Sequence, residues 1–485
     1  MRIVHLPSSY LPDSVGGTET YVQTLCRELE NLGHRTAVVW HAAGAPGAPL
    51  ESPSRADGID HAFRLPAIVH RSRTETYTRF AGQAPPGFRD FLRDWKPDVV
   101  HFHAFTLGAG EDHAECCRRE NIPYVITYHT PAMSCVRSTL LRWGADVCDG
   151  RLDPRRCSSC GLEARGWPKP LARLAALSPL SHRLVPDSPL TTRFTLPSVL
   201  AESNARWRRF FGGARHVIAC AEFCRDVLLA NDVSADSVSV HRQALRGEDR
   251  WRTLRLPIAA RVDAPLAVGY FGRINEVKGP DLLSAIVKGL RANGTNATGE
   301  WLGPLENDSR WAEAMFAAGA PYVRYAGVKR GVELDDWVRR RDLIVIPSRW
   351  LETGPLTLLE AWDQGTPAIG ADRGGIRDFM TAAGLPQCLF APGDAASATA
   401  AAKRMIAWSG AAPSVRVPGV RSLAERMLAI YDAAREPAAK NSTEEFASPG
   451  MVDGADPGRM SGPAGTAGPP DAALLDRGAT RVFAP

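Results

Sequence analysis

The sequence contains no run that approaches the roughly 18 to 20 apolar residues that a membrane-spanning helix requires. Its first residues, MRIVHLPSSYLP, lack the apolar stretch of about 7 to 15 residues that is typical of a secretory signal peptide. Both absences predict a cytoplasmic protein. An excess of one charge is also missing, because 58 Lys and Arg against 53 Asp and Glu leave a net charge of only +5. Composition therefore predicts no nucleic-acid partner.

The rest of the composition is that of an ordinary globular protein. The chain has 44% hydrophobic and 23% charged residues, which excludes fibrous and wholly disordered proteins. A single hydrophobic core rarely grows beyond about 250 to 300 residues. A chain of 485 residues is therefore expected to contain at least two domains.

Short β-rich runs alternate with longer helical patterns in two series. The first series starts at Arg2, Arg35, Asp98, Tyr124 and Arg215, and the second at Leu266, Glu300, Tyr322, Asp342 and Thr366. Strands that alternate with helices indicate parallel sheets. The predicted fold class is therefore α/β, with two doubly wound, Rossmann-like domains in tandem.

Changes in pattern set the expected domain boundaries. We predict an N-terminal domain over residues 1–243, an aperiodic linker over 244–264 and a C-terminal domain over 265–420. An amphipathic closing helix is predicted for 421–435. In 436–485, Gly, Pro and Ala supply 24 of the 50 residues, a composition that predicts a disordered tail.

Two cations follow the first strand of the second series. The strand LAVGYFG ends at Gly272, and the loop that follows contains Arg273 and Lys278. Ligands of parallel sheets bind at the carboxyl edge of the strands. The planar guanidinium of Arg and the compact ammonium of Lys together suit a diphosphate. A solvated surface turn is the alternative interpretation of this motif taken alone.

A second motif follows the strand DLIVIPS and combines a helix start with two acids. Pro355 suits the first helical position, so Gly354 and the amides after it, including those of Leu356 and Thr357, are predicted to form a helix N-terminus that receives a phosphate. Glu352 precedes this helix and Glu360 lies within it. Carboxylates accept hydrogen bonds from sugar and ribose hydroxyls. Cations, amides and acids together therefore predict a nucleotide sugar as the ligand.

At these residues the sequence resembles the signature of the retaining glycosyltransferases of family four, which have the GT-B fold with an active site between two domains. The resemblance implies that Glu352 holds hydroxyls of the donor sugar and Glu360 holds the ribose. It also implies that Arg273 and Lys278 bind the diphosphate. The expected reaction retains the anomeric configuration, uses no enzyme nucleophile and requires no cofactor or metal for the chemistry.

The N-terminal half carries weaker signals that the same resemblance extends. Gly16 and Gly17 open the first helix and, in similar proteins, lie across the cleft from the donor phosphates. His129 ends the strand YVITYH, and similar enzymes use a histidine at this point to contact the donor sugar. For His101 and His103, at another strand end, we predict structural roles.

Four cysteines lie close together in the segment 135–160. Cys135, Cys148, Cys157 and Cys160 include one CxxC pair, and four thiolates are a donor set for a structural zinc ion. Some similar proteins have a like cluster after the histidine. Reduced cysteines and disulfides remain the alternatives, and a catalytic role is not expected.

The segment 136–215 is basic, with fourteen Arg and Lys against six Asp and Glu, and it includes the apolar residues Trp143, Trp167, Leu184, Phe194 and Trp207. Such a surface suits peripheral contact with an anionic membrane and a lipid-linked acceptor. A solvated basic face is the alternative. In the GT-B fold the acceptor normally binds the N-terminal domain.

The sequence therefore predicts a glycosyltransferase that moves a sugar from a nucleoside diphosphate sugar to a glycan or lipid-linked acceptor, in polysaccharide or glycolipid biosynthesis. A nucleotide-sugar epimerase on the same fold and a catalytically silent scaffold are the alternatives. The chain departs from the family pattern at Ala221-Glu222, Arg242-Gln243, Gly303-Pro304 and Asp378.

Overall fold

The computed structural model describes residues 1–11, 13, 16–42, 62–68, 75, 78–79, 82–178, 188–256, 264–306 and 309–436. Apart from Glu436, these residues belong to one compact unit, Met1–Arg435. The tail predicted for 436–485 lies, after its first residue, outside the described residues. None of the described helices is both long and apolar enough to cross a bilayer.

The first sheet is parallel, and its seven described strands have the order β3-β2-β1-β4-β5-β8-β9. They span β1 Arg2–Leu6, β2 Arg35–His41, β3 Ala62–Leu65, β4 Val99–Phe102, β5 Tyr124–Tyr128, β8 His216–Ala219 and β9 Val238–Val240. The inner strands are almost entirely buried. Their continuous Val and Ile content fits a sheet that is covered on both faces.

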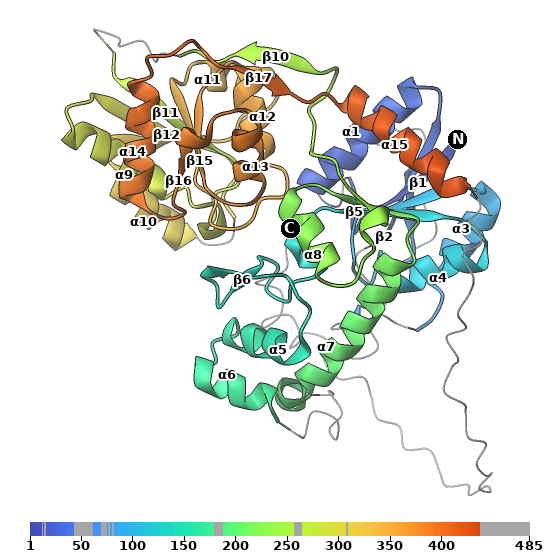
Figure 1. Cartoon of the computed structure of the whole chain (residues 1–485). Helices are drawn as coiled ribbons and strands as arrows, with labels where there is room; N and C mark the ends of the chain where they lie inside the picture. Colours follow the sequence, from blue (N-terminus) through green and yellow to red (C-terminus); the bar gives the residue numbers. More distant parts are fainter. Residues whose placement is uncertain are drawn as a thin grey trace, which may run out of the picture. The chain divides into compact units, whose positions relative to one another are not determined.

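Helices pack on this sheet as the alternating pattern predicts (Figure 1). They include α1 Gly17–Asn31, α3 Phe88–Trp95, α4 Glu111–Arg119 and α8 Glu222–Leu229. Between β5 and β8 the chain forms a helical insertion, preceded by the 3-10 turn Pro131–Met133. The insertion contains the hairpin β6 Leu141–Arg142 and β7 Asp146–Val147, followed by α5 Pro154–Glu163, α6 Lys169–Ala176 and α7 Pro189–Gly212.

The second sheet is also parallel, with six described strands in the order β13-β12-β11-β14-β15-β16. They span β11 Leu266–Phe271, β12 Ala297–Leu302, β13 Val323–Tyr325, β14 Leu343–Ile346, β15 Ala368–Ala371 and β16 Leu389–Phe390. Its helices are α9 Leu282–Ala292, α10 Ser309–Gly319, α11 Val332–Arg339, α12 Leu356–Asp363, α13 Gly374–Ala382 and α14 Ala395–Ile406. The α/β prediction is confirmed by the two sheets.

The chain passes between the two domains twice. The segment predicted as an aperiodic linker contains a strand, β10 Arg250–Thr253, that pairs antiparallel with β17 Ser414–Val417. The closing helix α15, Val420–Arg435, then returns to the first domain (Figure 1). Its buried residues Leu423, Met427 and Tyr431 share a core with Ile3 and Val22. The amphipathic pattern thus faces the N-terminal sheet, not the domain that precedes it in sequence.

Candidate functional site

The loop after β11 holds the two predicted diphosphate ligands, each beside a carboxylate. Arg273 Nη1 lies 2.9 Å from Glu306 Oε1. Lys278 Nζ lies 2.6 Å from Glu352 Oε1 and 4.9 Å from the centre of the Trp350 ring. Both cations therefore have protein partners that an incoming diphosphate would have to share or displace.

Asn275 shapes this loop. Its side-chain oxygen accepts a 2.9 Å hydrogen bond from the Lys278 amide, and its side-chain nitrogen donates a 2.6 Å bond to Glu306. Gly279, which follows, has φ +68°, and a Cβ there would lie 2.4 Å from the Pro347 carbonyl oxygen. Glycine is required at this turn because a side chain would meet the backbone at the end of β14.

Glu352 is buried and forms the centre of the second motif. Besides Lys278, Ser348 donates a 2.7 Å hydrogen bond to the same carboxylate oxygen. Burial opposes ionisation of this acid, but the Lys278 ammonium and the hydrogen bonds outweigh it, so the pKa of Glu352 is lowered. Glu352 is therefore an anion at neutral pH, able to accept hydroxyl hydrogen bonds through its lone pairs.

The backbone around Glu352 is fixed by the glycine turn that opens α13. The amide of Gly375 donates a 2.6 Å hydrogen bond to the Glu352 carbonyl. A Cβ on Gly374 or Gly375 would lie 2.9 or 2.8 Å from that same oxygen. This close approach explains why two small residues follow β15.

Helix α12 begins at Leu356, one residue later than predicted. Pro355 is the N-cap residue, and the Leu356 amide donates to the Gly354 carbonyl at 2.9 Å. Of the predicted amides, that of Leu356 is thus already bonded, whereas Thr357 lies in the first turn, where amides lack intrahelical acceptors. Gly354 packs against Gln243, whose Cδ would lie 2.5 Å from an added Cβ.

Glu360 lies on α12 and, in contrast to Glu352, has no cation beside its carboxylate among the described residues. Its carboxylate has no hydrogen bond or ion pair with any side chain in the described part of the chain. Burial, with repulsion from Asp335, raises its pKa to about 7. An unpartnered acid with a perturbed pKa in a ligand motif is a candidate binding group.

Gly16 and Gly17 form the start of α1. Gly16 is the N-cap in an extended conformation, and an added Cβ would lie 2.7 Å from Glu19 Oε2. Glu19 is buried, and Ser9 donates to its other oxygen at 3.3 Å. An added Cβ at Gly17 would meet nothing within 4 Å. The structure thus leaves open space only at the second glycine.

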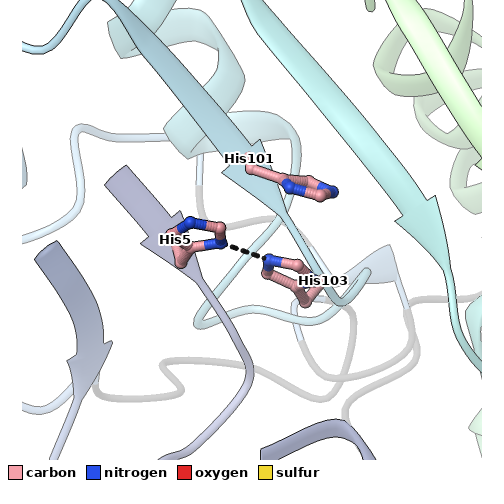
Figure 2. A group of neighbouring side chains, drawn as sticks. All are labelled: His5, His101 and His103. Atoms are coloured by element: carbon pink, nitrogen blue, oxygen red, sulfur yellow. Dashed lines mark hydrogen bonds between the residues drawn. The ribbon is translucent and has the colours of Figure 1, made fainter. Parts of the chain in front are cut away.

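His129 belongs to a buried chain of hydrogen-bonded imidazoles. His5 Nδ1 lies 2.9 Å from His103 Nε2, and His103 Nδ1 lies 2.9 Å from His129 Nε2. His129 Nδ1 lies 3.9 Å from Cys220 Sγ. Burial lowers the pKa of both His5 and His129 to about 3, so these rings are neutral at physiological pH. Figure 2 shows the His5–His103 contact between β1 and the end of β4.

The direction of the hydrogen bonds in this chain of imidazoles follows from the ring nitrogen at its end that has no partner within the described structure. His5 Nε2 is buried without a partner. If each ring donated its N–H toward His5, the proton of His5 would sit on Nε2, where no described group accepts it. If each ring donates toward His129, Nε2 of His5 carries only a lone pair without a donor. We assign the second arrangement, because a buried donor without a partner is the rarer group. His129 then accepts at Nε2 and carries its proton on Nδ1, facing Cys220.

The three histidines in Figure 2 also resemble a metal site. Within the described residues, one ring nitrogen of each of His5, His101 and His103 lies within 4.8 Å of the others. However, His101 already contacts the Tyr431 hydroxyl at 2.6 Å and Thr127 at 2.7 Å. We interpret the group as a hydrogen-bond network, which agrees with the structural roles predicted for His101 and His103.

His129 is only 3% exposed, and both of its ring nitrogens have protein neighbours. Contact of a ring nitrogen with a donor sugar stays a prediction, and it requires one of these contacts to open. Its backbone reaches the other domain, because Thr353 Oγ1 donates a 2.5 Å hydrogen bond to the His129 carbonyl.

The sequence analysis missed several contacts that support the site. Asp378 accepts a 3.0 Å hydrogen bond from the Glu222 amide, so two departures from the family pattern meet at the start of α8. Arg242 lies 3.7 Å from the Glu222 carboxylate. Ser348 could have been found from its position four residues before Glu352, whereas Glu306 has no signal in the sequence.

Comparisons with known proteins agree with this geometry. Residues 15–152 match the family model described as Glycosyltransferase Family 4, and residues 265–407 match the model described as Glycosyl transferases group 1. A D-inositol 3-phosphate glycosyltransferase of Stackebrandtia nassauensis is 33% identical over 74% of this chain and 72% of its own. A 2-deoxystreptamine N-acetyl-D-glucosaminyltransferase of Streptomyces fradiae is 28% identical over 80% of this chain and 82% of its own.

A solved glycosyltransferase from Rickettsia africae matches the fold with a TM-score of 0.51 at 12% identity, covering 90% of this chain and 92% of that one. The predicted GT-B fold is thereby confirmed. The predicted glycosyltransferase function is confirmed by the family matches, and neither relative named above is an epimerase. The chain belongs to the family-four glycosyltransferases.

Proposed function

We propose that this glycosyltransferase moves a hexose from a nucleoside diphosphate sugar to a glycan or lipid-linked acceptor, with retention of the anomeric configuration. The observation that carries the proposal is the contrast between the two motif acids. Glu352 is held as an anion by Lys278 at 2.6 Å, and Glu360 has no side-chain partner among the residues that the structure describes. Cations for a diphosphate and acceptors for two sets of hydroxyls thus belong to one motif.

In this proposal Arg273 and Lys278 stabilise the negative charge that develops on the leaving diphosphate. The amide of Thr357, at the N-terminus of α12, donates a further hydrogen bond to it. These cations supply the charge neutralisation, so we propose that the chemistry needs no metal. Glu352 orients sugar hydroxyls through its lone pairs, and Glu360 accepts from the ribose. Gly17 gives the donor phosphates room near α1.

The identity of the donor nucleoside and sugar is tested by a thermal-shift panel of UDP-, GDP-, ADP- and dTDP-sugars. A ligand that binds only the folded protein raises the midpoint of its thermal unfolding. One nucleotide is expected to raise the midpoint, and Glu360→Ala to abolish the rise. No shift with any sugar nucleotide would contradict the proposal. Retention is tested by NMR of the product anomer.

The acceptor is tested separately. The relatives are named for transfer to 2-deoxystreptamine and for D-inositol 3-phosphate, so these two compounds join glycan and lipid-linked acceptors in the assay. The predicted cytoplasmic location and peripheral membrane contact stay predictions. Of the apolar residues expected at the membrane, Trp207 is buried and Leu184 lies outside the described residues.

Within the same segment, α6 carries exposed leucines beside the predicted residues Trp167 and Phe194. Leu171, Leu174 and Leu177 are 52%, 69% and 61% exposed, and Arg173 lies among them. With Trp167 and neighbouring residues they line a hollow of about 390 Å³. We propose this surface for peripheral contact with anionic lipid. Leu174→Asp should reduce sedimentation with phosphatidylglycerol vesicles, and an unchanged bound fraction would contradict the contact.

A further inference from the structure

The four clustered cysteines surround one small cavity in the insertion. Cys135, Cys148, Cys157 and Cys160 all line a cavity of about 30 Å³. This volume suits a single water-sized or ion-sized occupant. None of the four is in a disulfide. The structure therefore brings together side chains that the sequence spreads over 26 positions, and it does so around a space for one small ligand.

The cysteines come from three different elements. Cys135 follows the 3-10 turn Pro131–Met133, and its amide donates to the Pro131 carbonyl at 2.8 Å. Cys148 ends the hairpin, with its amide donating to the Leu140 carbonyl at 2.8 Å. The remaining two lie three positions apart on α5, which places them on one face of that helix. A ligand bound to all four would therefore cross-link the whole segment.

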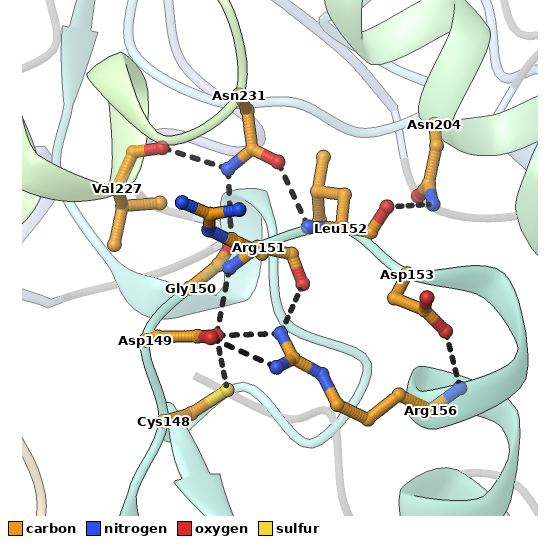
Figure 3. Close-up of polar contacts among 10 residues, drawn as sticks. All are labelled: Cys148, Asp149, Gly150, Arg151, Leu152, Asp153, Arg156, Asn204, Val227 and Asn231. Atoms are coloured by element: carbon orange, nitrogen blue, oxygen red, sulfur yellow. Dashed lines mark hydrogen bonds and ion pairs between the residues drawn. The ribbon is translucent and has the colours of Figure 1, made fainter.

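Polar and basic groups surround the sulfurs. The Trp143 amide donates to Cys160 Sγ at 3.5 Å. Cys148 Sγ lies 3.7 Å from Asp149, which in turn binds Arg156 through contacts of 2.5 and 2.9 Å (Figure 3). Arg156 and Arg142 also line the cavity. Arg156 is paired with Asp149, so Arg142 is the guanidinium left to offset part of the −2 charge of a divalent cation with four thiolates.

The loop is strained, although Leu140 and Leu141 pack into the first-domain core, and the helices that follow it have a small core of their own. Ser138, Leu140 and Trp143 have φ values of +63°, +52° and +54°, which non-glycine residues rarely adopt. Five buried residues form the local core, namely Leu162, Ala172, Ala175, Leu196 and Leu200. Such conformations persist only where the surroundings fix them, and a metal cross-link supplies that constraint in segments with small cores.

Hydrogen bonds anchor the far end of the segment to the first domain. Asn231 accepts from the Leu152 amide at 2.8 Å and donates to the Gly150 carbonyl at 2.9 Å. Asn204 donates to the Leu152 carbonyl at 3.2 Å (Figure 3). These contacts fix the chain between Cys148 and α5, and burial of Leu140 and Leu141 in the first-domain core holds the hairpin.

The sulfurs surround the cavity without closing on one point. Among the described residues, only His5, His101 and His103 bring three candidate ligand atoms within 4.8 Å of one another. In a tetrahedral zinc site, with Zn–S near 2.3 Å, the sulfurs would be about 3.8 Å apart. Binding of the ion would therefore have to draw the sulfurs inward.

We propose that Cys135, Cys148, Cys157 and Cys160 bind one structural zinc ion, which fixes the segment after His129. Four sulfur donors select zinc over hard cations such as Mg²⁺. The site has no open coordination position for substrate, so its role is in stability. This inference is independent of the proposed donor and acceptor.

The test is metal analysis of the full-length protein, purified without a metal-affinity step from zinc-supplemented medium. About one zinc per chain is expected, and Cys148→Ser and Cys157→Ser are each expected to lose most of it. Cys116→Ser, at a buried cysteine outside the cluster, should retain full zinc. Zinc-free wild-type protein, bound iron, a disulfide found by mass spectrometry, or unchanged zinc in both cluster variants would overturn the proposal.

A second measurement covers the case in which the serine variants fail to fold. A strong chelator should lower the melting temperature of the wild-type protein, and reloading with zinc should restore it. Cobalt(II) reloaded in its place should give the intense visible absorption of a tetrahedral thiolate complex. Cobalt spectra without thiolate charge-transfer bands, or a melting temperature that the chelator does not change, would overturn the assignment.

Discussion

Thr353 Oγ1 donates a 2.5 Å hydrogen bond to the backbone carbonyl of His129. This bond joins the residue after Glu352 to the end of β5, so the acid motif of the second domain is tied to the first-domain sheet. The Thr353 side chain is buried, and the bond does not involve the imidazole. A contact of this kind sets the position of Glu352 relative to the end of β5.

Thr353→Val is therefore expected to lower kcat by about 10- to 100-fold while leaving donor Kd nearly unchanged, because small displacements of reacting groups are costly. Thr353→Ser keeps the hydroxyl and should recover most of the activity. The measurement is steady-state kinetics together with donor titration calorimetry. Full activity in the valine variant, with a loss in the serine variant, would show that packing of the methyl group, not the hydrogen bond, matters.

Lys278→Met is expected to abolish donor binding and to lower kcat/KM by at least about 100-fold, because it removes a cation from the predicted diphosphate site. It also leaves the buried Glu352 carboxylate without its ammonium partner, so stability should fall. The double variant Lys278→Met with Glu352→Gln separates these effects. Its melting temperature should recover, and its donor affinity should not.

Lys288→Met provides the matched control. Lys288 lies on α9, and its ammonium donates to the Ala318 carbonyl at 2.7 Å near the protein surface. Its replacement should leave donor binding unchanged. If Lys278→Met bound the donor as tightly as this control, the diphosphate assignment would be wrong.

Glu360 predicts a pH dependence of both stability and donor binding. Its folded pKa is raised to about 7 from 4.5. Between these values the folded state retains a proton that the unfolded state has lost, so stability falls as pH rises through this window. Glu360→Gln should remove that fall. Because the carboxylate is the better acceptor for ribose hydroxyls, donor affinity should rise from pH 6 to 8.

The measurement is donor titration calorimetry and thermal melting at several pH values. Glu360→Gln should bind more weakly with a flat pH profile. Asp335→Asn is the informative companion, because repulsion from Asp335 contributes to the raised pKa. It should move the midpoint of the wild-type profile to lower pH. An unchanged profile in both variants would remove Glu360 from the ribose site.

The sequence predicts elements with strong local signals. All ten predicted strand runs contain strands, and the apolar runs of most of them are buried on both faces. It misses the short edge strands β3, β9 and β16 and the small hairpin of β6 and β7. It also misses β10 and β17, which are stabilised by pairing with each other across a long stretch of sequence. The start of α12 is displaced by one residue because Pro355 acts as the cap.

The candidate site is only partly predictable for a similar reason. The motif residues are identifiable by their spacing, but the direct pairing of Lys278 with Glu352 depends on two loops that meet only in the folded chain. The hydrogen-bonded chain of histidines could have been predicted from the sequence. His101 and His103 are two positions apart, and β4, which leads to them, lies beside the strands of His5 and His129, so neighbouring strand ends predict their meeting.

The histidine chain gives a last prediction, on acid stability. The pKa of His5 is lowered by burial to about 3, whereas the unfolded side chain titrates near 6.5. Between these values the unfolded state binds more protons, so the stability present above pH 6.5 is lost as pH falls toward 3. His5→Leu should reduce the slope of unfolding free energy against pH by up to about 1.36 kcal/mol per pH unit.

Urea unfolding from pH 5 to 8.5 measures this slope. The leucine variant should be less stable overall, because His103 Nε2 loses its neighbour, but its curve should run parallel to that of the wild type above pH 7.5, where histidines are neutral in both states. Convergence of the two curves toward acid pH is the expected result. Curves that stay parallel down to pH 5 would mean that His5 titrates alike in the folded and unfolded protein, and the neutral state assigned to its buried ring would then be wrong.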